Sequence, residues 1–285
     1  MQDVAIVTDT VACLTQQQIE QHHIHLVPPR FSINGHEYRD FVDISATEVY
    51  RLLDSYPDTF ATSAASPHDF LKAFHEASKA AGHVLCITVS SRLSAQFDMA
   101  QVAVGLAKQE LPHTTTQVVD SRNAAAAEGL VVLAAARAAA EGRSLAEVVE
   151  TAKDTVERTH FLAVLETVRY VYRTGRVPKL AVRAGSALNV KPILTCSNGV
   201  IRLAGAARTK ERGINRILET MRSRVAGRPV RVGVMHADAT EEAERLEERI
   251  SSEFHCEELW VGEFSPLMGY ATGRGFLGLS FCVEA

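Results

Sequence analysis

The feature that most constrains this chain is a series of short apolar runs, each ending in a cluster of polar residues. In the first half these runs are Val4–Val7, Val84–Val89 and Gln117–Val119. Short runs with almost no polar residue are typical of strands buried on both faces, as in a parallel sheet covered by crossover helices. The first half therefore predicts a parallel sheet with helices on both sides.

The segments between these runs carry helix start signals. Three of them begin with a serine followed three residues later by an acidic residue, the spacing of a capping box. The pairs are Ser45 with Glu48, Ser66 with Asp69, and Ser144 with Glu147. We expect helices after all three serines, the second reaching about Ala81 and the third about Arg158. The alanine-rich stretch Asn123–Ala140 has high helix propensity and predicts a fourth.

The second half begins differently, near residue 160. Candidate strands Val190–Thr195 and Val200–Leu203 flank Asn198-Gly199, a turn signal for an antiparallel hairpin. Further strands are expected at 230–235, 259–261 and 277–283, with helices over 209–225 and from an Asp238 cap to about 254. With 285 residues, about two domains are expected. We predict an α/β fold: a three-layer α/β/α domain with a parallel sheet over residues 1–160, and an α+β domain with a mixed sheet over 161–285.

Charge and composition exclude several classes of protein. Thirty Lys and Arg residues against 34 Asp and Glu give a net charge of −4, so there is no basic footprint for nucleic acid. The start of the chain lacks a signal-peptide pattern, and no apolar run is long enough to cross a membrane. We therefore expect a cytoplasmic protein without stable membrane insertion. The five cysteines are widely separated and are expected to be free, buried thiols.

Two motifs suggest cofactors but lack the necessary context. Gly273–Gly278 matches G-x-G-x-x-G, which needs a following helix, whereas only Leu279–Ala285 follow and they resemble a strand. We interpret it as a glycine-rich turn beside a ligand or a domain interface. The histidines at 22, 23 and 25 have no ligand set around them apart from Glu20, so a solvated helix end is favoured over a metal site. We expect neither a metal nor a cofactor.

Thr8-Asp9-Thr10 follows the first predicted strand and has two interpretations. Asp9 can be a turn or helix cap, which is the commoner role of an aspartate at a strand end. It can also be the nucleophile of a small-molecule hydrolase or phosphatase. His236 and Asp238 also follow a strand, but Asp238 is already assigned as a helix cap.

Hydroxyl side chains recur near the ends of the predicted first-half strands or in their connections. They are Thr62 and Ser63, then Ser90, Ser91 and Ser94, and then the segment from Thr114-Thr115-Thr116 to Asp120-Ser121. Parallel sheets bind ligands outside the carboxyl ends of their strands. A hydroxyl both donates and accepts hydrogen bonds without carrying charge, so such a cluster suits a carboxylate head group.

At these residues the sequence resembles the DegV family of bacterial fatty-acid-binding proteins, over nearly the whole chain. The matching pieces include Thr8-Asp9-Thr10, Thr62-Ser63, Ser90-Ser91-x-Leu93-Ser94, Val119-Asp120-Ser121, Gly175-Arg176-Val177, Asn189-x-Lys191-Pro192 and Arg208-Thr209. The resemblance implies two domains around a lipid tunnel, with the carboxylate of a long-chain fatty acid held by hydroxyls at the domain cleft. The matching positions are Thr62, Ser63 and Ser94.

The chain departs from the family pattern at two places. The family's S-G-T-Y is Ser94-Ala95-Gln96-Phe97 here, so the Gln96 amide stands where a threonine hydroxyl is expected to meet the head group. The family's H-T-G-P-G is Ala271–Gly275, which loses a histidine near the carboxylate. We hypothesise that Arg274 supplies the missing positive charge. Arg176, Lys191 and Arg208 match basic family positions and are candidates for head-group binding or partner docking.

The resemblance also implies a role for the chain. The best-known family members are acyl-carrier subunits that present a bound fatty acid to a separate, ATP-dependent fatty acid kinase subunit, so this chain is expected to carry lipid without being an enzyme. The loss of the family histidine puts the kinase partner in question. Two alternatives stay open: a lipid sensor without phosphotransfer, and a hydrolase or phosphatase that uses Asp9.

Overall fold

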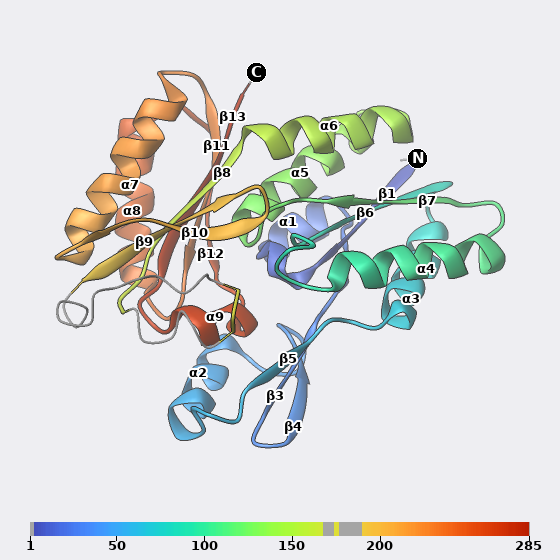
Figure 1. The fold of residues 1–285 in the computed structure, drawn as a ribbon. Helices are drawn as coiled ribbons and strands as arrows, with labels where there is room; N and C mark the ends of the chain where they lie inside the picture. The colour runs from blue at the N-terminus through green and yellow to red at the C-terminus, as the bar shows by residue number, and fades with distance from the viewer. Residues whose placement is uncertain (1–2, 168–173, 177–189, 285) are drawn as a thin grey trace.

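A computed structural model describes residues 3–167, 174–176 and 190–284 and shows two large sheets with helices around them (Figure 1). The first sheet has four strands in the order β2-β1-β6-β7, all parallel, as predicted. Its strands are β1 (Val4–Asp9), β2 (His25–Val27), β6 (His83–Thr88) and β7 (Thr115–Asp120). The first two apolar runs form the central strands β1 and β6, which are covered on both faces, and the third lies in the edge strand β7.

Helices lie on both faces of this sheet, which confirms the three-layer α/β/α arrangement. They are α3 (Pro67–Ser78) and α4 (Gln96–Glu110) on one face, and α5 (Ala126–Ala140) and α6 (Leu145–Arg158) on the other. In β6, Val84 and Cys86 pack with α3 and α4, whereas Leu85 and Ile87 pack with α5. Alternate side chains of a strand point to opposite faces, so one apolar run supplies two cores.

The second sheet is mixed, as predicted, with the strand order β10-β9-β8-β13-β11-β12. Its strands are β8 (Thr159–Val164), β9 (Lys191–Ser197), β10 (Val200–Ala207), β11 (Val230–His236), β12 (Cys256–Glu263) and β13 (Leu277–Val283). The helices α7 (Lys210–Val225) and α8 (Thr240–Glu253) cover one face. The β9–β10 turn has positive φ at Asn198 (51°) and Gly199 (77°), as an Asn-Gly hairpin requires.

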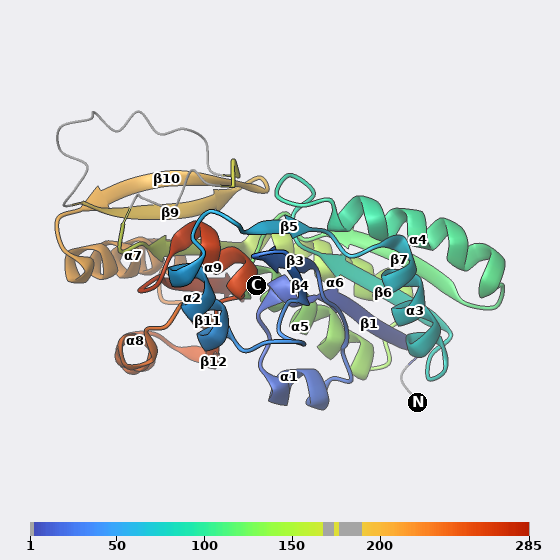
Figure 2. The same cartoon turned by 90° about the horizontal axis from the view of Figure 1, so that it is seen from below.

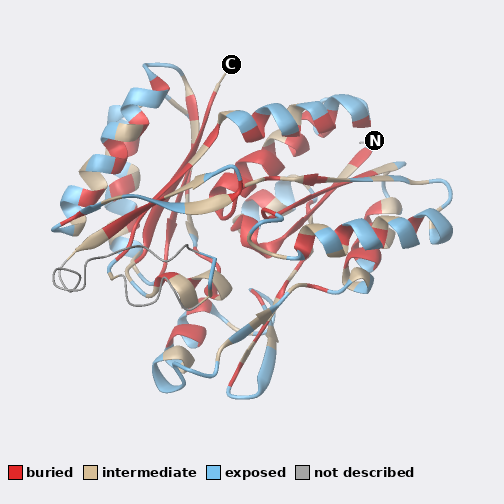
Figure 3. Ribbon diagram, in the orientation of Figure 1, coloured by how far each residue is buried: buried red, intermediate tan, exposed pale blue. Residues whose placement is uncertain are grey.

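Helix α5 packs against strands of both sheets: β1 and β6 of the first, and β8, β11 and β13 of the second. Figure 3 shows it buried along nearly its whole length. The helix can pack against both sheets because it is rich in alanine, and small side chains allow a close approach. At Gly129 a Cβ atom would lie 2.7 Å from the backbone oxygen of Ala12, so α5 touches the main chain of the 3-10 turn that follows β1.

A small antiparallel sheet was not predicted. It has the order β4-β3-β5, with β3 (Arg30–Ile33), β4 (His36–Arg39) and β5 (Ala61–Ser63), and it carries α2 (Ala46–Ser55). Its core contains Phe31, Ile33 and Val49. Helix α2 packs against α9 (Pro266–Thr272), as the view from below suggests (Figure 2). The remaining helix, α1 (Gln16–Gln21), follows β1. Thr62 and Ser63 therefore lie on this small sheet and not on the parallel one.

The capping boxes at Ser45, Ser66 and Ser144 are all present. Two boundaries are corrected: α3 ends at Ser78 and not near Ala81, and α5 begins at Ala126 and not at Asn123. The predicted Asp238 cap was wrong. Asp238 has a φ of 52° and its carboxylate pairs with Arg274 at 3.1 Å, while α8 begins after Ala239 without a side-chain cap. The Asp238 carboxylate thus forms a tertiary ion pair with Arg274 and does not cap α8.

The other expected features are found as follows. Gly273 and Gly275 have positive φ (79° and 76°) in a turn that leads into β13, as interpreted from the glycine motif. All five cysteines are free; Cys13, Cys86 and Cys282 are buried and the other two partly so. Within the described ranges, no helix is long and apolar enough to span a bilayer. The strands of the first sheet precede residue 121 and those of the second follow residue 158, so the predicted boundary at 160 falls at the start of β8.

Candidate functional site

The main candidate site is a pocket of about 320 Å³ at the carboxyl edge of the parallel sheet. One wall comes from the segments that follow β1, β6 and β7, which contribute Val11, Val89, Ala124 and Ala125. This is the edge at which parallel sheets bind ligands. The volume is within the range typical of small-molecule sites.

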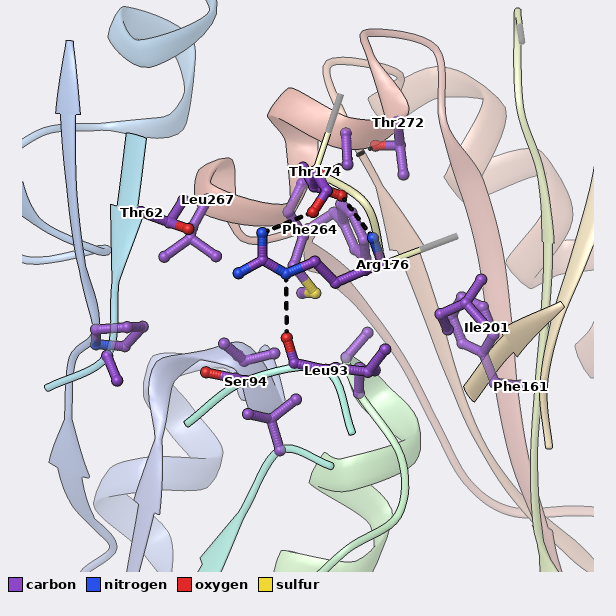
Figure 4. A pocket seen from close by; sticks show the side chains of 18 of the residues that line it. Thr62, Leu93, Ser94, Phe161, Thr174, Arg176, Ile201, Phe264, Leu267 and Thr272 are labelled. Carbon is purple, nitrogen blue, oxygen red and sulfur yellow. Dashed lines mark hydrogen bonds between the residues drawn. The ribbon is translucent and has the colours of Figure 1, made fainter. Parts of the chain in front are cut away.

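The opposite wall comes from the second sheet and from α9, and it is apolar. Phe161 of β8, Leu194 of β9 and Ile201 of β10 lie there, with Leu267 and Met268 of α9. Figure 4 shows Phe161 and Ile201 at one end of the pocket and Thr62 and Ser94 at the other. The pocket therefore has an apolar end and a polar end.

The pocket contains several hydroxyls and one cation. Its polar side chains are Thr62, Ser63, Ser94, Thr174, Arg176 and Thr272. Figure 4 shows Thr272 on α9, apart from Thr62 and Ser94 at the polar end. The Arg176 Nε donates to the Leu93 carbonyl at 3.2 Å, and its Nη1 donates to the Thr174 carbonyl at 2.8 Å (Figure 4). Among the described residues it is the only charged side chain that lines the pocket, and none of their carboxylates pairs with it. Since Arg176 is exposed, this end opens to solvent.

Two helices begin at this pocket without a side-chain cap. Ala95 precedes α4 and Ala125 precedes α5; both line the pocket and neither can cap a helix. The first amide groups of a helix lack partners within the helix, and the helix dipole favours negative charge there. The start of α4 lies directly beside Ser94, at the polar end. The helix dipole and Arg176 therefore both favour an anion at that end.

The structure brings together some of the predicted site residues and separates others. Thr62, Ser63, Ser94 and Arg176 line the pocket, as does Ala271, which occupies the family histidine position. Gln96 does not line it: its side chain is fully buried and its Oε1 accepts a hydrogen bond from the Ala65 amide at 2.7 Å. Val177 and Asn189, which belong to the matched motifs, lie outside the described residues.

The remaining predicted cations lie elsewhere. Lys191 pairs with the Glu166 carboxylate and also donates to its carbonyl at 3.0 Å, and Arg208 is exposed beyond β10. Arg274 lines a different cavity, where its guanidinium pairs with Asp54 at 3.0 Å and Asp238 at 3.1 Å. Two carboxylates already neutralise Arg274, so it is not placed to replace the family histidine at the pocket.

Buried acids lie behind the pocket wall. The carboxylate of Asp9 caps the turn after β1 by accepting the Val11 amide at 3.0 Å, and it also accepts the Val89 amide at 3.0 Å. Burial raises the pKa of Asp9 to about 7, and it raises that of the adjacent Glu128 well above its usual value. Both Asp9 oxygens hold backbone amides of pocket-wall residues. These hydrogen bonds agree with the interpretation of Asp9 as a turn cap. They give no support to a role for Asp9 as a nucleophile.

Asp40 forms a second buried junction. Its Oδ2 accepts from the Thr10 hydroxyl at 2.6 Å and the Ser265 hydroxyl at 2.8 Å, and its Oδ1 accepts from the Leu267 amide at 3.4 Å. Burial raises its pKa to about 6. Asp40 thus joins the small sheet to the turn after β1 and to the start of α9, two elements that line the pocket.

Sequence reasoning missed most of the apolar wall and all of α9. Leu267, Met268 and Thr272 come from this helix, whose start carries a usable signal, a serine followed by proline at Ser265-Pro266. No pattern assigns Phe161, Leu194 or Ile201 to a pocket, because each lies in a strand that reads as ordinary core.

Comparison with known proteins adds to this geometry. The family model described as "Uncharacterised protein, DegV family COG1307" matches residues 3–284. A DegV domain-containing protein of Caldanaerobacter subterraneus subsp. tengcongensis is 32% identical over 282 residues, 99% of each chain. Protein DegV of Bacillus subtilis is 28% identical over 99% of this chain and all of its own.

Solved structures share the fold throughout. A fatty-acid-binding DegV family protein from Thermus thermophilus superposes with a TM-score of 0.90 at 28% identity, covering 99% of this chain and all of that one. DegV of Bacillus subtilis, described as a fatty acid binding protein, gives a TM-score of 0.89 at 26% identity with both chains fully covered.

Proposed function

The chain belongs to the DegV family, and from this premise we propose that it binds one long-chain fatty acid in the pocket described above. The acyl chain lies toward Phe161, Leu194 and Ile201, and the carboxylate lies at the polar end. The observation that carries the proposal is a pocket with one apolar end and one end where Arg176 lies with hydroxyl side chains and has no carboxylate partner among the described residues. The fatty acids bound by the similar Thermus and Bacillus proteins support it.

The two ends of the pocket contribute differently to binding. Burial of a methylene group is worth about 0.8 kcal/mol, so the fourteen methylenes of a sixteen-carbon acid provide about 11 kcal/mol before ordering costs. A hydrogen bond to a charged group is worth about 1.5–3 kcal/mol. The tail therefore supplies most of the affinity, while Arg176 and the hydroxyls of Thr62, Ser63 and Ser94 fix the orientation.

The direct test is to identify the ligand. Native mass spectrometry of the purified protein is expected to show one bound molecule, and organic extraction is expected to release a long-chain fatty acid. After delipidation, a sixteen-carbon acid should bind again with one-to-one stoichiometry. If the protein carries no acyl chain and the delipidated form binds none, the proposal is wrong.

The finer part of the proposal concerns the use of the bound acid. We propose that the loaded protein presents its carboxylate to a separate, ATP-dependent fatty acid kinase subunit. The γ-phosphoryl group of ATP would pass to a carboxylate oxygen, giving an acyl phosphate and ADP. The solvent-exposed polar end supports such a step. Incubation of the loaded protein with ATP and a DegV-associated kinase should yield acyl phosphate; no transfer, with the lipid still bound, would favour a sensor.

Arg176→Gln is expected to weaken fatty acid binding by about tenfold to a hundredfold, because a charge-assisted hydrogen bond to the carboxylate is lost. Binding of the fatty alcohol of equal length should change little. Arg208→Gln is the matched control, since Arg208 is exposed and does not line the pocket. Titration calorimetry of the delipidated proteins measures the affinities for the acid and for the alcohol. If the affinities for the acid and the alcohol fell equally, Arg176 would not bind the carboxylate.

A further inference from the structure

Gln96 joins the two segments that carry the head-group hydroxyls. Thr62, Ser63 and Ala64 line the pocket, and the amide of the next residue, Ala65, donates to the Gln96 Oε1 at 2.7 Å. The backbone N–H of Gln96, in turn, donates to the Ser94 Oγ at 3.4 Å. The Gln96 side chain thus holds the segment after β5 to the first residue of α4, and the Gln96 backbone holds Ser94 beside it.

The segment held by Gln96 follows a short edge strand. Strand β5 has three residues and lies at the edge of the small sheet, where it pairs with β3 alone. Its partly exposed or exposed residues include both Thr62 and Ser63. Because β3 holds it on one side only, this segment is held against α4 by the hydrogen bond from Ala65 to Gln96, by the buried Ala65 side chain and by α3, which begins at Pro67 and packs on α4.

The environment of Gln96 argues against a purely stabilising role. Its side chain is fully buried, and its Nε2 has no hydrogen-bond partner among the described residues. A buried donor without a partner lowers stability, and an apolar side chain of similar shape avoids that cost. Proteins keep such local costs at functional sites. A buried, half-satisfied amide behind a ligand pocket is therefore better explained by its effect on the ligand.

We propose that Gln96 is a positioning residue that sets the spacing between the Thr62 and Ser63 hydroxyls and the Ser94 hydroxyl, and so makes the pocket selective for a carboxylate over a neutral head group. The proposal rests on the proposed function. A carboxylate has two oxygens that accept hydrogen bonds in a fixed geometry, so its binding depends on hydroxyls held at a fixed separation. A fatty alcohol needs one partner and tolerates a change in that spacing.

The test compares a sixteen-carbon fatty acid with the alcohol of equal length in two variants. Gln96→Met keeps the approximate shape of the side chain but removes the acceptor for the Ala65 amide. We expect acid affinity to fall about tenfold and alcohol affinity to change less than twofold. Gln101→Met is the matched control, because Gln101 is exposed on the same helix, and both affinities should stay unchanged.

A second measurement needs no variant. If Gln96 couples the Ala65 segment to the carboxylate site, then binding of the acid should stabilise that segment, since coupling between sites is reciprocal. Hydrogen exchange at the Ala65 amide of the wild-type protein should slow more with the acid bound than with the alcohol. Equal protection by both ligands, or equal loss of both affinities in Gln96→Met, overturns the proposal. If wild-type protein binds no fatty acid at all, it is the proposed function that has failed.

Discussion

Gly129→Ala is expected to lower the free energy of unfolding by about 3 kcal/mol, the upper range for overpacking a core. The new Cβ atom would lie 2.7 Å from the backbone oxygen of Ala12 and 3.1 Å from a methyl carbon of Leu14. Helix α5 cannot move away, because it packs against strands of both sheets. The turn that would have to shift carries Val11, so we also expect weaker ligand binding. Chemical denaturation and ligand titration measure the two effects.

Gly105→Ala provides the matched control for this prediction. Gly105 lies inside α4, has no atom within 4 Å of an added Cβ, and faces solvent. Alanine in an exposed helix interior is favoured over glycine by about 0.5–1 kcal/mol, so this variant should be more stable than wild type. If Gly129→Ala were stabilising to the same extent, the close approach of α5 to the turn after β1 would be disproved.

Asp40 is expected to make stability depend on pH. Its pKa is about 6 in the folded protein, because of burial, against an ordinary value of 3.8. Between these values the folded state holds a proton that the unfolded state has lost, so stability falls as pH rises through this window. At about 1.4 kcal/mol per pH unit, the loss between pH 4 and pH 7 is about 3 kcal/mol.

The measurement is a comparison with Asp40→Asn, which cannot titrate. The free energy of unfolding of wild type, less that of the variant, should fall by about 3 kcal/mol from pH 4 to pH 7. Hydrogen bonds that the variant loses shift this difference by the same amount at every pH, so they do not affect its slope. The comparison is needed because other buried groups also titrate in wild type: Asp9, whose pKa burial raises to about 7, acts in the same direction, and His160, whose pKa burial lowers to about 4, acts in the opposite direction. A difference that stays constant over this pH range would rule out a raised pKa for Asp40.

Local signals predicted much of the fold because the relevant interactions are local. The capping boxes at Ser45, Ser66 and Ser144 involve residues three apart, and the Asn198-Gly199 turn needs only its own positive φ angles. The small sheet escaped prediction for the same reason. Strand β4 is mostly exposed and β5 has three residues, so neither carries a recognisable pattern, and both depend on pairing with β3.

The site was predictable only where the family resemblance reached it. The resemblance identified four residues that line the pocket, which are Thr62, Ser63, Ser94 and Arg176. Their positions in the sequence do not show which contacts hold these side chains in place. Gln96 was expected to contact the head group and instead bonds a backbone amide behind it. Arg274 was expected there too, yet Asp54 and Asp238 hold it at another cavity. Such outcomes depend on contacts between residues far apart in sequence.

The position of α5 between the two sheets has a consequence for dissecting the protein. A cut at residue 160 falls within the first residues of β8, and it leaves α5 on the first fragment with the face that packs against β8, β11 and β13 bare. The second fragment would lose the helix that covers one face of its own sheet. The pocket would also be divided, since each fragment supplies one of its walls. Neither half is thus a self-sufficient unit for expression, and the proposed ligand binding requires the intact chain.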